Sequence, residues 1–439
     1  MKKVITYGTF DLLHFGHIRL LERAKALGDY LIVGVTADDF DKKRGKINVN
    51  QSLMERVEAV RATGIANEII VEEYEGQKID DIRRYDIDIF TVGSDWVGKF
   101  DYLSEYCEVI YLERTHGVSS SDLRTEKRKI RLGTLGNSII INKIINECEY
   151  VNGLEISGAY SINKDVKVNK LFNTIDELLD ESDAVYICSR PALHYEQIKM
   201  ALEKGKHVLC ETPIALTRKE KNELHKVAKK NKCILMDSIK TAYSTAYSRI
   251  LLLAKSGKIG QIMSVDATAT SLRDLEVSPI EQEWNSINAW GPTVLLPVFQ
   301  LLGTDYKKKT IISKLIDDKM MFDGFTKIDF VYDNAVASVK VGKSVKAEGE
   351  MIIAGTKGYI YVPAPWWKTD YFEIRYEDQT ENRRYFYQLE GEGIRYELVE
   401  FLKEIETGRN TSYINKNVSD EICGVIEDFY NKKSFIELK

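Results

Sequence analysis

Short apolar runs alternate with amphipathic segments over the first part of the chain. Residues 4–7 form an apolar run that Gly8 ends, and residues 17–27 place Ile18, Leu21, Ala24 and Leu27 on one helical face. Further apolar runs lie at residues 30–35, 69–71, 87–92 and 109–112. Because nearly continuous apolar strands that alternate with helices are typical of a parallel sheet covered on both faces, we predict an α/β domain over residues 1–126.

A charged segment at residues 122–131 lacks apolar periodicity and predicts a domain boundary. The alternation then restarts, with strands expected at residues 130–135, 154–160, 184–188, 207–210 and 233–236, which predicts a second doubly wound unit over 127–258. After about residue 260 the strands alternate in polarity or are β-branched, and a last helix is expected at 396–406. We therefore predict a third, α+β domain over 259–439 with a mostly antiparallel sheet.

Charge and composition restrict the partners. The chain has 439 residues, with 62 Lys and Arg against 67 Asp and Glu, for a net charge of −5, whereas proteins that work along nucleic acid usually carry a basic excess. The longest apolar stretches, at 138–141 and 293–302, are too short to span a bilayer, and a turn interrupts the N-terminus before a signal-peptide core could form. The six cysteines are scattered and contain no CxxC pair. We expect a cytoplasmic protein with reduced thiols that binds neither nucleic acid nor membrane.

The segment GTFDLLHFGH at residues 8–17 places two histidines at a strand-to-helix junction. His14 and His17 enter the helix three residues apart and can face one ligand, while the helix N-terminus adds backbone N–H donors and a positive dipole. Two imidazoles there can hold nucleotide phosphates and stabilise the charge that develops during displacement at phosphorus. The alternative is a pair of structural histidines.

This segment resembles the HxGH signature of the nucleotidyltransferase superfamily. With LLERAKALGDYLIVGV, VGSDWVGKFDYL and CEVIYLERTHGVSSS, it resembles in particular the glycerol-3-phosphate cytidylyltransferases, over residues 1 to about 125. The resemblance implies a Rossmann-like nucleotidyltransferase domain in which His14 and His17 contact the triphosphate and the transition state. It also implies that the acceptor phosphate attacks the α-phosphorus of CTP in line, that pyrophosphate leaves, and that Mg²⁺ neutralises the triphosphate. The implied CTP-binding residues are Thr9, Phe10, His14, Gly16, His17, Lys46, Asp95, Arg114, Thr115, Gly117, Val118, Ser119 and Ser120.

Acceptor recognition is the point at which the first domain departs from this pattern. Lys43 and Lys78 match the lysines expected near the acceptor phosphate. Gly64 stands where close relatives tend to have an arginine, and Arg56 or Arg61 is the expected compensation.

The glycine fingerprint of a dinucleotide site is weak in the second part. In IRLGTLGNS, residues 130–138, Gly136 fits the first glycine position, but Ser138 and Ile141 occupy the other two. The segments at 176–217, 354–367 and 391–408, however, resemble the glucose–fructose oxidoreductase and inositol dehydrogenase (Gfo/Idh/MocA) family. The resemblance implies a Rossmann NAD(P)-binding domain followed by the α+β domain. The implied cofactor-binding residues are Gly136, Asn137, Ser138, Ser161, Lys164, Ser189, Pro191, His194, Glu211 and Thr212, with Pro191 and His194 beside the nicotinamide.

The catalytic lysine of that family is replaced by Thr212, and its downstream Asp and His pair is not visible in residues 288–303. One interpretation is an altered active site in which Lys240, or else Tyr243, donates the proton. The other is a domain that binds but no longer reduces. After the second strand no acidic residue is present to bind an NAD ribose, and Lys164 could meet a 2′-phosphate, so NADPH is favoured over NADH. The alternative is that Lys164 is a solvated loop lysine.

Together the two resemblances predict a bifunctional enzyme that makes a CDP-activated alditol for capsule or teichoic-acid-type polymers. It would transfer CMP to a sugar or polyol phosphate and reduce a keto group with NAD(P)H. The alternative is a cytidylyltransferase with a non-catalytic binding or oligomerisation module. Both families imply a homodimer or higher homo-oligomer.

Overall fold

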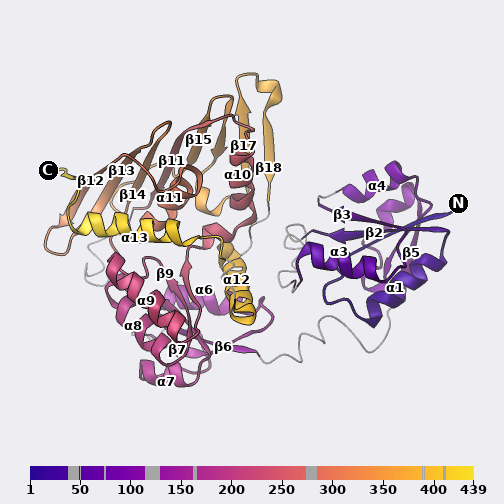
Figure 1. Ribbon diagram of the computed structural model, residues 1–439, viewed down its shortest axis with the longest axis horizontal. Helices are drawn as coiled ribbons and strands as arrows, with labels where there is room; N and C mark the ends of the chain where they lie inside the picture. Colours follow the sequence, from indigo (N-terminus) through magenta and orange to yellow (C-terminus); the bar gives the residue numbers. More distant parts are fainter. Residues whose placement is uncertain are drawn as a thin grey trace. The chain divides into compact units, whose positions relative to one another are not determined.

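The computed structural model describes residues 1–37, 49, 51–73, 76–113, 129–161, 166–272, 284–387, 389, 391–408 and 412–439. The chain divides into two compact units, Met1–Lys129 and Ile130–Lys439 (Figure 1). None of the helices in the described part of the chain combines the length and the apolar character that crossing a bilayer requires.

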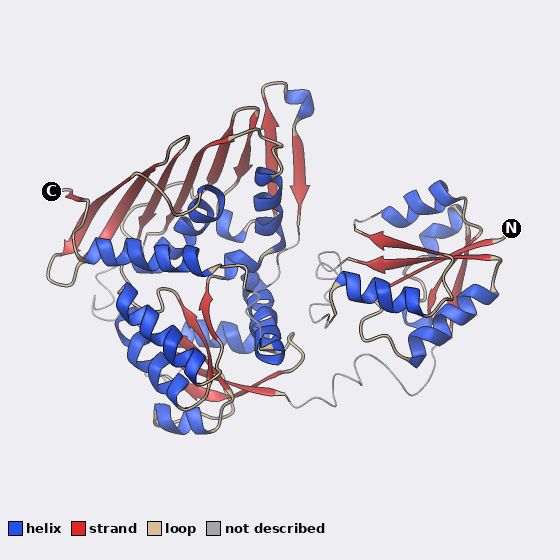
Figure 2. Ribbon diagram, in the orientation of Figure 1, coloured by secondary structure: helices blue, strands red, loops and turns tan. Residues whose placement is uncertain are grey.

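The first unit is a five-stranded parallel sheet with helices on both faces (Figure 2). Its strands lie in the order β3-β2-β1-β4-β5, so the order reverses between β1 and β4. Successive strand residues alternate between two apolar cores, one against α1 and α3 and the other against α4. The predicted α/β fold is confirmed. Its elements are β1 (Lys3–Gly8), α1 (Phe15–Ala26), β2 (Tyr30–Thr36), α3 (Leu53–Ala62), β3 (Glu68–Glu72), α4 (Gln77–Tyr85), β4 (Ile89–Gly93), η1 (Ser94–Trp96), η2 (Asp101–Glu105) and β5 (Glu108–Leu112).

The second unit begins with another parallel sheet, in the strand order β10-β9-β8-β6-β7. Here the order reverses between β6 and β8, which makes the carboxyl ends of those strands the expected ligand crevice. The predicted Rossmann domain is confirmed. Its elements are β6 (Ile130–Gly136), α6 (Ser138–Cys148), β7 (Leu154–Tyr160), α7 (Ile175–Asp180), β8 (Ala184–Cys188), α8 (Pro191–Glu203), β9 (His207–Glu211), α9 (Arg218–Lys230), β10 (Leu235–Ser238), η3 (Lys240–Tyr243) and α10 (Thr245–Lys255).

A nine-stranded sheet completes the second unit, in the order β18-β17-β16-β15-β11-β14-β13-β12-β19. Its pairs are antiparallel except β11 with β14 and β12 with β19, in agreement with the predicted mostly antiparallel sheet. The strands are β11 (Ile262–Thr270), β12 (Lys308–Asp317), β13 (Phe322–Val331), β14 (Val336–Gly342), β15 (Met351–Gly355), β16 (Gly358–Val362), β17 (Tyr371–Tyr376), β18 (Arg383–Phe386) and β19 (Phe435–Glu437).

Helix α11 (Ser286–Leu302) packs on this sheet, whereas α12 (Ile394–Thr407) packs on α6 and η3 of the Rossmann part. The remaining elements of the unit are α13 (Lys416–Tyr430) and the short turns η5 (Trp366–Lys368), η6 (Gln379–Glu381) and η7 (Gly391–Gly393). The prediction that the helix near residues 396–406 is the last one is wrong, because α13 follows it. Helix α13 packs on α11 and is tied to α9 by Arg218, whose guanidinium pairs with Glu421 and Glu427. The Rossmann sheet and the larger sheet are therefore joined through helices into one compact unit.

Candidate functional site

The turn between β1 and α1 brings the two predicted histidines together at the point where the first sheet reverses its strand order. Phe10 and Leu12 adopt positive φ values of 53° and 49° in this turn. The rings of His14 and His17 lie nearly parallel, with centroids 3.9 Å apart and an interplanar angle of 20°. The backbone N–H of Gly16 donates to His14 Nδ1 over 3.1 Å. A neutral His14 therefore carries its proton on Nε2, where it can be donated to an anion at the helix N-terminus.

A buried arginine, Arg56, stabilises this turn through hydrogen bonds to backbone carbonyl oxygens. Arg56 is fully buried; its Nη1 donates to the carbonyl oxygens of Thr9 and Thr36 over 2.7 and 2.8 Å, and its Nε donates to that of Gln51 over 3.2 Å. The Gln51 N–H in turn donates to Asp11 Oδ1 over 3.0 Å. The guanidinium thus ties the ends of β1 and β2 to the start of α3.

The structure shows what Arg56 and Arg61 contact, and their expected compensation for Gly64 in acceptor recognition stays a prediction. Arg56 is fully buried and its donors are used by backbone carbonyls. Arg61 lies exposed on α3 and pairs with Glu58 one turn earlier on the same helix.

Lys78, predicted to meet the acceptor phosphate, is buried near the carboxyl ends of the strands. Its ammonium pairs with Glu72 and lies 4.6 Å from the centroid of the Tyr7 ring and 5.4 Å from that of Phe100. Tyr7 donates to Asp81 over 2.9 Å, and burial together with this carboxylate raises the pKa of Tyr7 well above its usual value. The charge of Lys78 is thus compensated by Glu72, and its contact with a phosphate stays a prediction.

The other predicted CTP residues are only partly covered by the described chain. Thr9 and Phe10 are buried within the turn, and the Phe10 ring packs edge to face on the His17 ring with their centroids 5.6 Å apart. Gly16 is partly exposed on α1, and Asp95 is exposed in η1. Within the described ranges no group of three His, Cys, Asp or Glu side chains could hold a metal ion. The predicted residues that lie outside the described residues are Lys43, Lys46, Arg114, Thr115, Gly117, Val118, Ser119 and Ser120, and in the second unit Lys164.

In the second unit, the turn after β6 has the close backbone approach that a dinucleotide site needs. Gly136 has φ of +130°, and a Cβ there would lie 2.4 Å from the carbonyl carbon of Cys188 and from the N of Ser189. Ser161 Oγ donates to the Gly136 carbonyl over 2.8 Å. Asn137 caps α6, and Ser138 is its first residue; the Asn137 Oδ1 accepts from the N–H groups of residues 139 and 140, the donors that a pyrophosphate would meet. The close backbone approach suits a nicotinamide dinucleotide, and the Asn137 side-chain oxygen accepts from the N–H groups that a pyrophosphate oxygen would use.

His194 joins two loops at the edge of the crevice. It is fully buried, with Nδ1 2.8 Å from the Pro213 carbonyl oxygen and Nε2 2.8 Å from that of Ser189. Burial lowers the pKa of His194 despite these two acceptors. Pro191 begins α8. The ring of His194 therefore holds the Ser189 loop against the segment after Glu211, and its contact with the nicotinamide stays a prediction.

Thr212, which replaces the family lysine, uses its hydroxyl internally. Its Oγ1 donates to the Ser238 carbonyl oxygen over 2.7 Å, and the side chain is buried. Beside it, Tyr186 Oη lies 2.6 Å from Glu211 Oε1 and 3.2 Å from Ser238 Oγ, and Ser238 Oγ lies 2.8 Å from Glu397 Oε2. The sequence pattern did not predict three residues of this site, Tyr186, Ser238 and Glu397. Tyr186 lies within an apolar strand, and Glu397 resembles an ordinary charged residue on a helix surface.

The two predicted replacement donors lie in different surroundings. Lys240 Nζ forms an ion pair with Glu392 Oε2 at 2.9 Å, and Lys143 and Lys368 pair with the same carboxylate. These three ammonium groups hold the pKa of Glu392 far below its usual value, although partial burial raises it. Tyr243 is buried and its Oη lies 2.9 Å from Ser412 Oγ. Lys240 retains partial exposure just after the carboxyl end of β10, whereas Tyr243 is buried and its hydroxyl is paired with that of Ser412.

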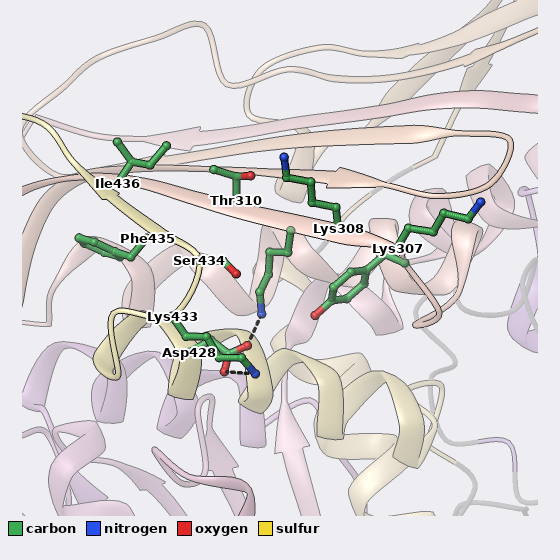
Figure 3. Close-up of a pocket in the computed structure, with 10 residues that line it drawn as sticks. Lys307, Lys308, Thr310, Asp428, Lys433, Ser434, Phe435 and Ile436 are labelled. Carbon is green, nitrogen blue, oxygen red and sulfur yellow. Dashed lines mark hydrogen bonds and ion pairs between the residues drawn. The ribbon is translucent and has the colours of Figure 1, made fainter.

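A separate hollow of about 540 Å³ opens at the edge of the large sheet, between β12, β19 and the end of α13 (Figure 3). Lys309 Nζ lies 2.5 Å from Asp428 Oδ2 in its wall, and Lys433 approaches the same carboxylate at 3.6 Å. It contains none of the residues predicted to bind CTP or the dinucleotide.

Comparisons with known proteins identify relatives of both units. Residues 5–126 match the cytidylyltransferase-like family model, and residues 151–238 match the model of an oxidoreductase family with an NAD-binding Rossmann fold. The first unit is 53% identical over 126 residues to glycerol-3-phosphate cytidylyltransferase from Bacillus spizizenii, a match that covers 29% of this chain and 97% of the relative. The corresponding enzyme from Staphylococcus aureus is 46% identical over 129 residues, covering 29% of this chain and 95% of the relative.

The second unit has more distant relatives. scyllo-Inositol 2-dehydrogenase (NADP(+)) from Bacillus subtilis is 33% identical over 124 residues, a match that covers 26% of this chain and 38% of the dehydrogenase. A 3-ketoreductase from Actinomadura kijaniata, solved in complex with NADP and TDP-benzene, superposes with a TM-score of 0.63 at 17% identity, over 71% of this chain and all of that chain. At that identity the superposition shows the fold alone. The chain thus belongs, through its first unit, to the glycerol-3-phosphate cytidylyltransferase family, and residues 151–238 of the unit fused to it match the Gfo/Idh/MocA oxidoreductase model.

Proposed function

We propose that this chain is a bifunctional enzyme that makes a CDP-activated alditol. One unit transfers CMP from CTP to a sugar or polyol phosphate, and the other reduces the keto group of the sugar with NAD(P)H. The observation that carries the transferase half is the stacked pair of His14 and His17 at the N-terminus of α1, at the strand-order reversal of the first sheet. The proposal includes a cytoplasmic homo-oligomer that supplies a polymer of the capsule or teichoic-acid type.

In the transferase reaction the protein mainly positions and stabilises charge. The Nε2–H of His14 and the imidazole of His17 meet the phosphate oxygens as negative charge grows at the α-phosphorus, together with backbone N–H groups of α1. The acceptor needs no general base, because a phosphate monoester is already an anion at neutral pH. Mg²⁺ bound to the triphosphate would add further neutralising charge.

In the reductase reaction the turn after Gly136 and the start of α6 would hold the dinucleotide pyrophosphate. The carboxyl ends of β8 and β9, with Ser189 and Glu211, would border the nicotinamide. The bound cofactor supplies a hydride to the carbonyl carbon. The protein must then provide a proton for the carbonyl oxygen, and Lys240 is the donor predicted from the sequence.

A non-catalytic second unit is the competing function, and one observation favours it. The hydroxyl of Thr212, in the place of the family lysine, is bound to the Ser238 carbonyl and buried. In this alternative the second unit binds a nucleotide or joins protomers, and only the cytidylyl transfer is catalysed.

The two functions are separated by assaying the full chain with CTP and Mg²⁺, with and without NADPH or NADH. The acceptor panel comprises glycerol 3-phosphate, ribulose 5-phosphate, fructose 6-phosphate and dihydroxyacetone phosphate. Pyrophosphate release reports transfer, and loss of reduced-cofactor absorbance reports reduction. The bifunctional proposal expects both signals with one keto substrate or with its CDP derivative. Pyrophosphate release with no cofactor oxidation for any substrate would leave the non-catalytic alternative.

A further inference from the structure

The reductase half of the proposed function needs an acid at the carboxyl ends of β8, β9 and β10. We propose that Glu211 is that acid, and that Tyr186 and Ser238 connect it to a proton held in reserve on Glu397. This inference rests on the proposed reduction. It follows from a continuous row of oxygen atoms that runs from the crevice into the interior of the unit.

The row brings together residues that are far apart in the chain. Tyr186 is on β8, Glu211 ends β9, Ser238 ends β10, and Glu397 lies in the first turn of α12. The contacts are Glu211 Oε1 to Tyr186 Oη at 2.6 Å, Tyr186 Oη to Ser238 Oγ at 3.2 Å, and Ser238 Oγ to Glu397 Oε2 at 2.8 Å. Glu211 is partly exposed, whereas Tyr186, Ser238 and Glu397 are 1, 4 and 1% exposed.

Counting hydrogens shows what this row requires. If Glu397 is ionised, Ser238 donates to it and Tyr186 donates to Glu211, which leaves the contact between the two hydroxyl oxygens without a hydrogen. If Glu397 is protonated, it donates to Ser238, Ser238 donates to Tyr186, and Tyr186 donates to Glu211. Only a proton shared along the row gives every contact a hydrogen, and moving it reverses all three bonds together.

The surroundings favour the protonated form. Burial, then the nearby Glu211 carboxyl, raises the pKa of Glu397 well above its usual value, and burial also raises the pKa of Glu211. Lys240 faces both carboxyl groups and opposes these shifts, and Tyr243 faces Glu397. The Ser238 hydroxyl and the backbone N–H of Ile239 also oppose the shift of Glu397, but each has a smaller effect than burial, and Glu397 Oε1 has no hydrogen-bond partner within the described part of the chain.

The proton transfer balances when the reaction starts with one proton on the crevice-side oxygen of Glu211 and a second proton on Glu397. As NAD(P)H is oxidised, its hydride forms the new C–H bond at the carbonyl carbon, and the carbonyl oxygen takes the proton from the crevice-side oxygen of Glu211. Glu211 Oε1 then takes the hydroxyl proton of Tyr186, which takes that of Ser238, which takes that of Glu397. The row is restored when Glu211 receives a proton from water and the three bonds reverse. Glu211 is the catalytic residue in this account, and the other three are positioning and supplying residues.

The test uses the full chain and two independent readouts. Infrared difference spectroscopy without cofactor, across neutral pH, should show a protonated carboxyl band that Glu397→Gln removes and Tyr186→Phe retains. Absence of any band that Glu397→Gln removes would overturn the reserve proton, whether or not the chain is a reductase.

The second readout is oxidation of NADPH or NADH with ribulose 5-phosphate, fructose 6-phosphate or dihydroxyacetone phosphate. Glu211→Gln should lower the rate about 10²-fold or more, the usual contribution of a general acid. Tyr186→Phe should lower it less and move the pH profile, while the matched variant Tyr195→Phe, on α8 outside the row, should keep both. Release of pyrophosphate from CTP in the other unit should stay at the wild-type rate in all variants.

Three results separate the possible failures. Wild-type rates and pH profiles in both Glu397→Gln and Tyr186→Phe would refute the relay. Loss of reduction at every pH in Lys240→Met, with Glu211→Gln still active, would assign the proton to Lys240 instead. Failure of the wild-type chain to oxidise either cofactor with any of the probes would refute the proposed reduction and the delivery step with it, while the infrared result would still decide whether Glu397 holds a proton.

Discussion

Replacing Arg56 with methionine tests whether the turn that carries the histidines depends on a buried guanidinium. The variant removes the three hydrogen bonds that the guanidinium donates to the carbonyl oxygens of Thr9, Thr36 and Gln51 inside the first unit. An unpaired buried polar group costs about 1–3 kcal/mol, and removal of a buried charge offsets part of the sum. Taking the low end for each of the three, we expect Arg56→Met to lower the free energy of unfolding of this unit by about 3 kcal/mol.

Hydrogen exchange of the full chain, followed by mass spectrometry, measures this effect unit by unit. About 3 kcal/mol corresponds to a roughly 100-fold faster exchange of the most protected amides in Met1–Lys129, with those of Ile130–Lys439 unchanged. The matched control is Arg61→Met on the same helix, which removes only an exposed pair with Glu58 and should change exchange by a small factor. Equal exchange in Arg56→Met and Arg61→Met would refute the bracing role, and equal acceleration in both units would show that the effect is not local.

Three further predictions concern His17, Gly136 and the buried Asp323 of β13. His17→Ala should lower pyrophosphate release from CTP about 10²-fold with the fold retained by circular dichroism, and near-normal turnover would exclude the assigned role. Gly136→Ala should destabilise the second unit and weaken dinucleotide binding, because a Cβ there would lie 2.4 Å from backbone atoms. The control Gly205→Ala also lies at positive φ but has no atom within 4 Å of the added Cβ, so it should lower the free energy of unfolding, measured in urea, by only about 1–2 kcal/mol. Equal losses in the two variants would contradict the crowding argument. Burial raises the pKa of Asp323 to about 6, so between about pH 4 and 6 the folded state holds a proton that the unfolded chain releases. The free energy of unfolding should therefore fall as pH rises through this window. Asp323→Asn should remove this part of the dependence of stability on pH, and an unchanged dependence would refute the prediction.

Local patterns in the sequence determined the two α/β units and the first site. Apolar strands that need cover on both faces can form only a layered parallel sheet, so the alternation of strands and helices is readable from neighbouring residues alone. The histidines of residues 14 and 17 are close in sequence and share one helix start, so their meeting is also a local event. The mostly antiparallel sheet was predicted from a different local pattern, the polarity that alternates within each strand.

Tertiary structure decided what the isolated side chains do. Arg56 looks like a free cation in the sequence, but the fold buries it against backbone carbonyls of two strand ends, so it supports the turn between them. The oxygen row from Glu211 to Glu397 joins four elements, and Ser238 and Glu397 are 159 residues apart. No periodicity reports such contacts, because they depend on which strand ends the parallel register places side by side and on which helix then closes over them. Burial by that closure gives a glutamate in an ordinary helical pattern a raised pKa, since the same carboxyl on a solvated helix would remain ionised.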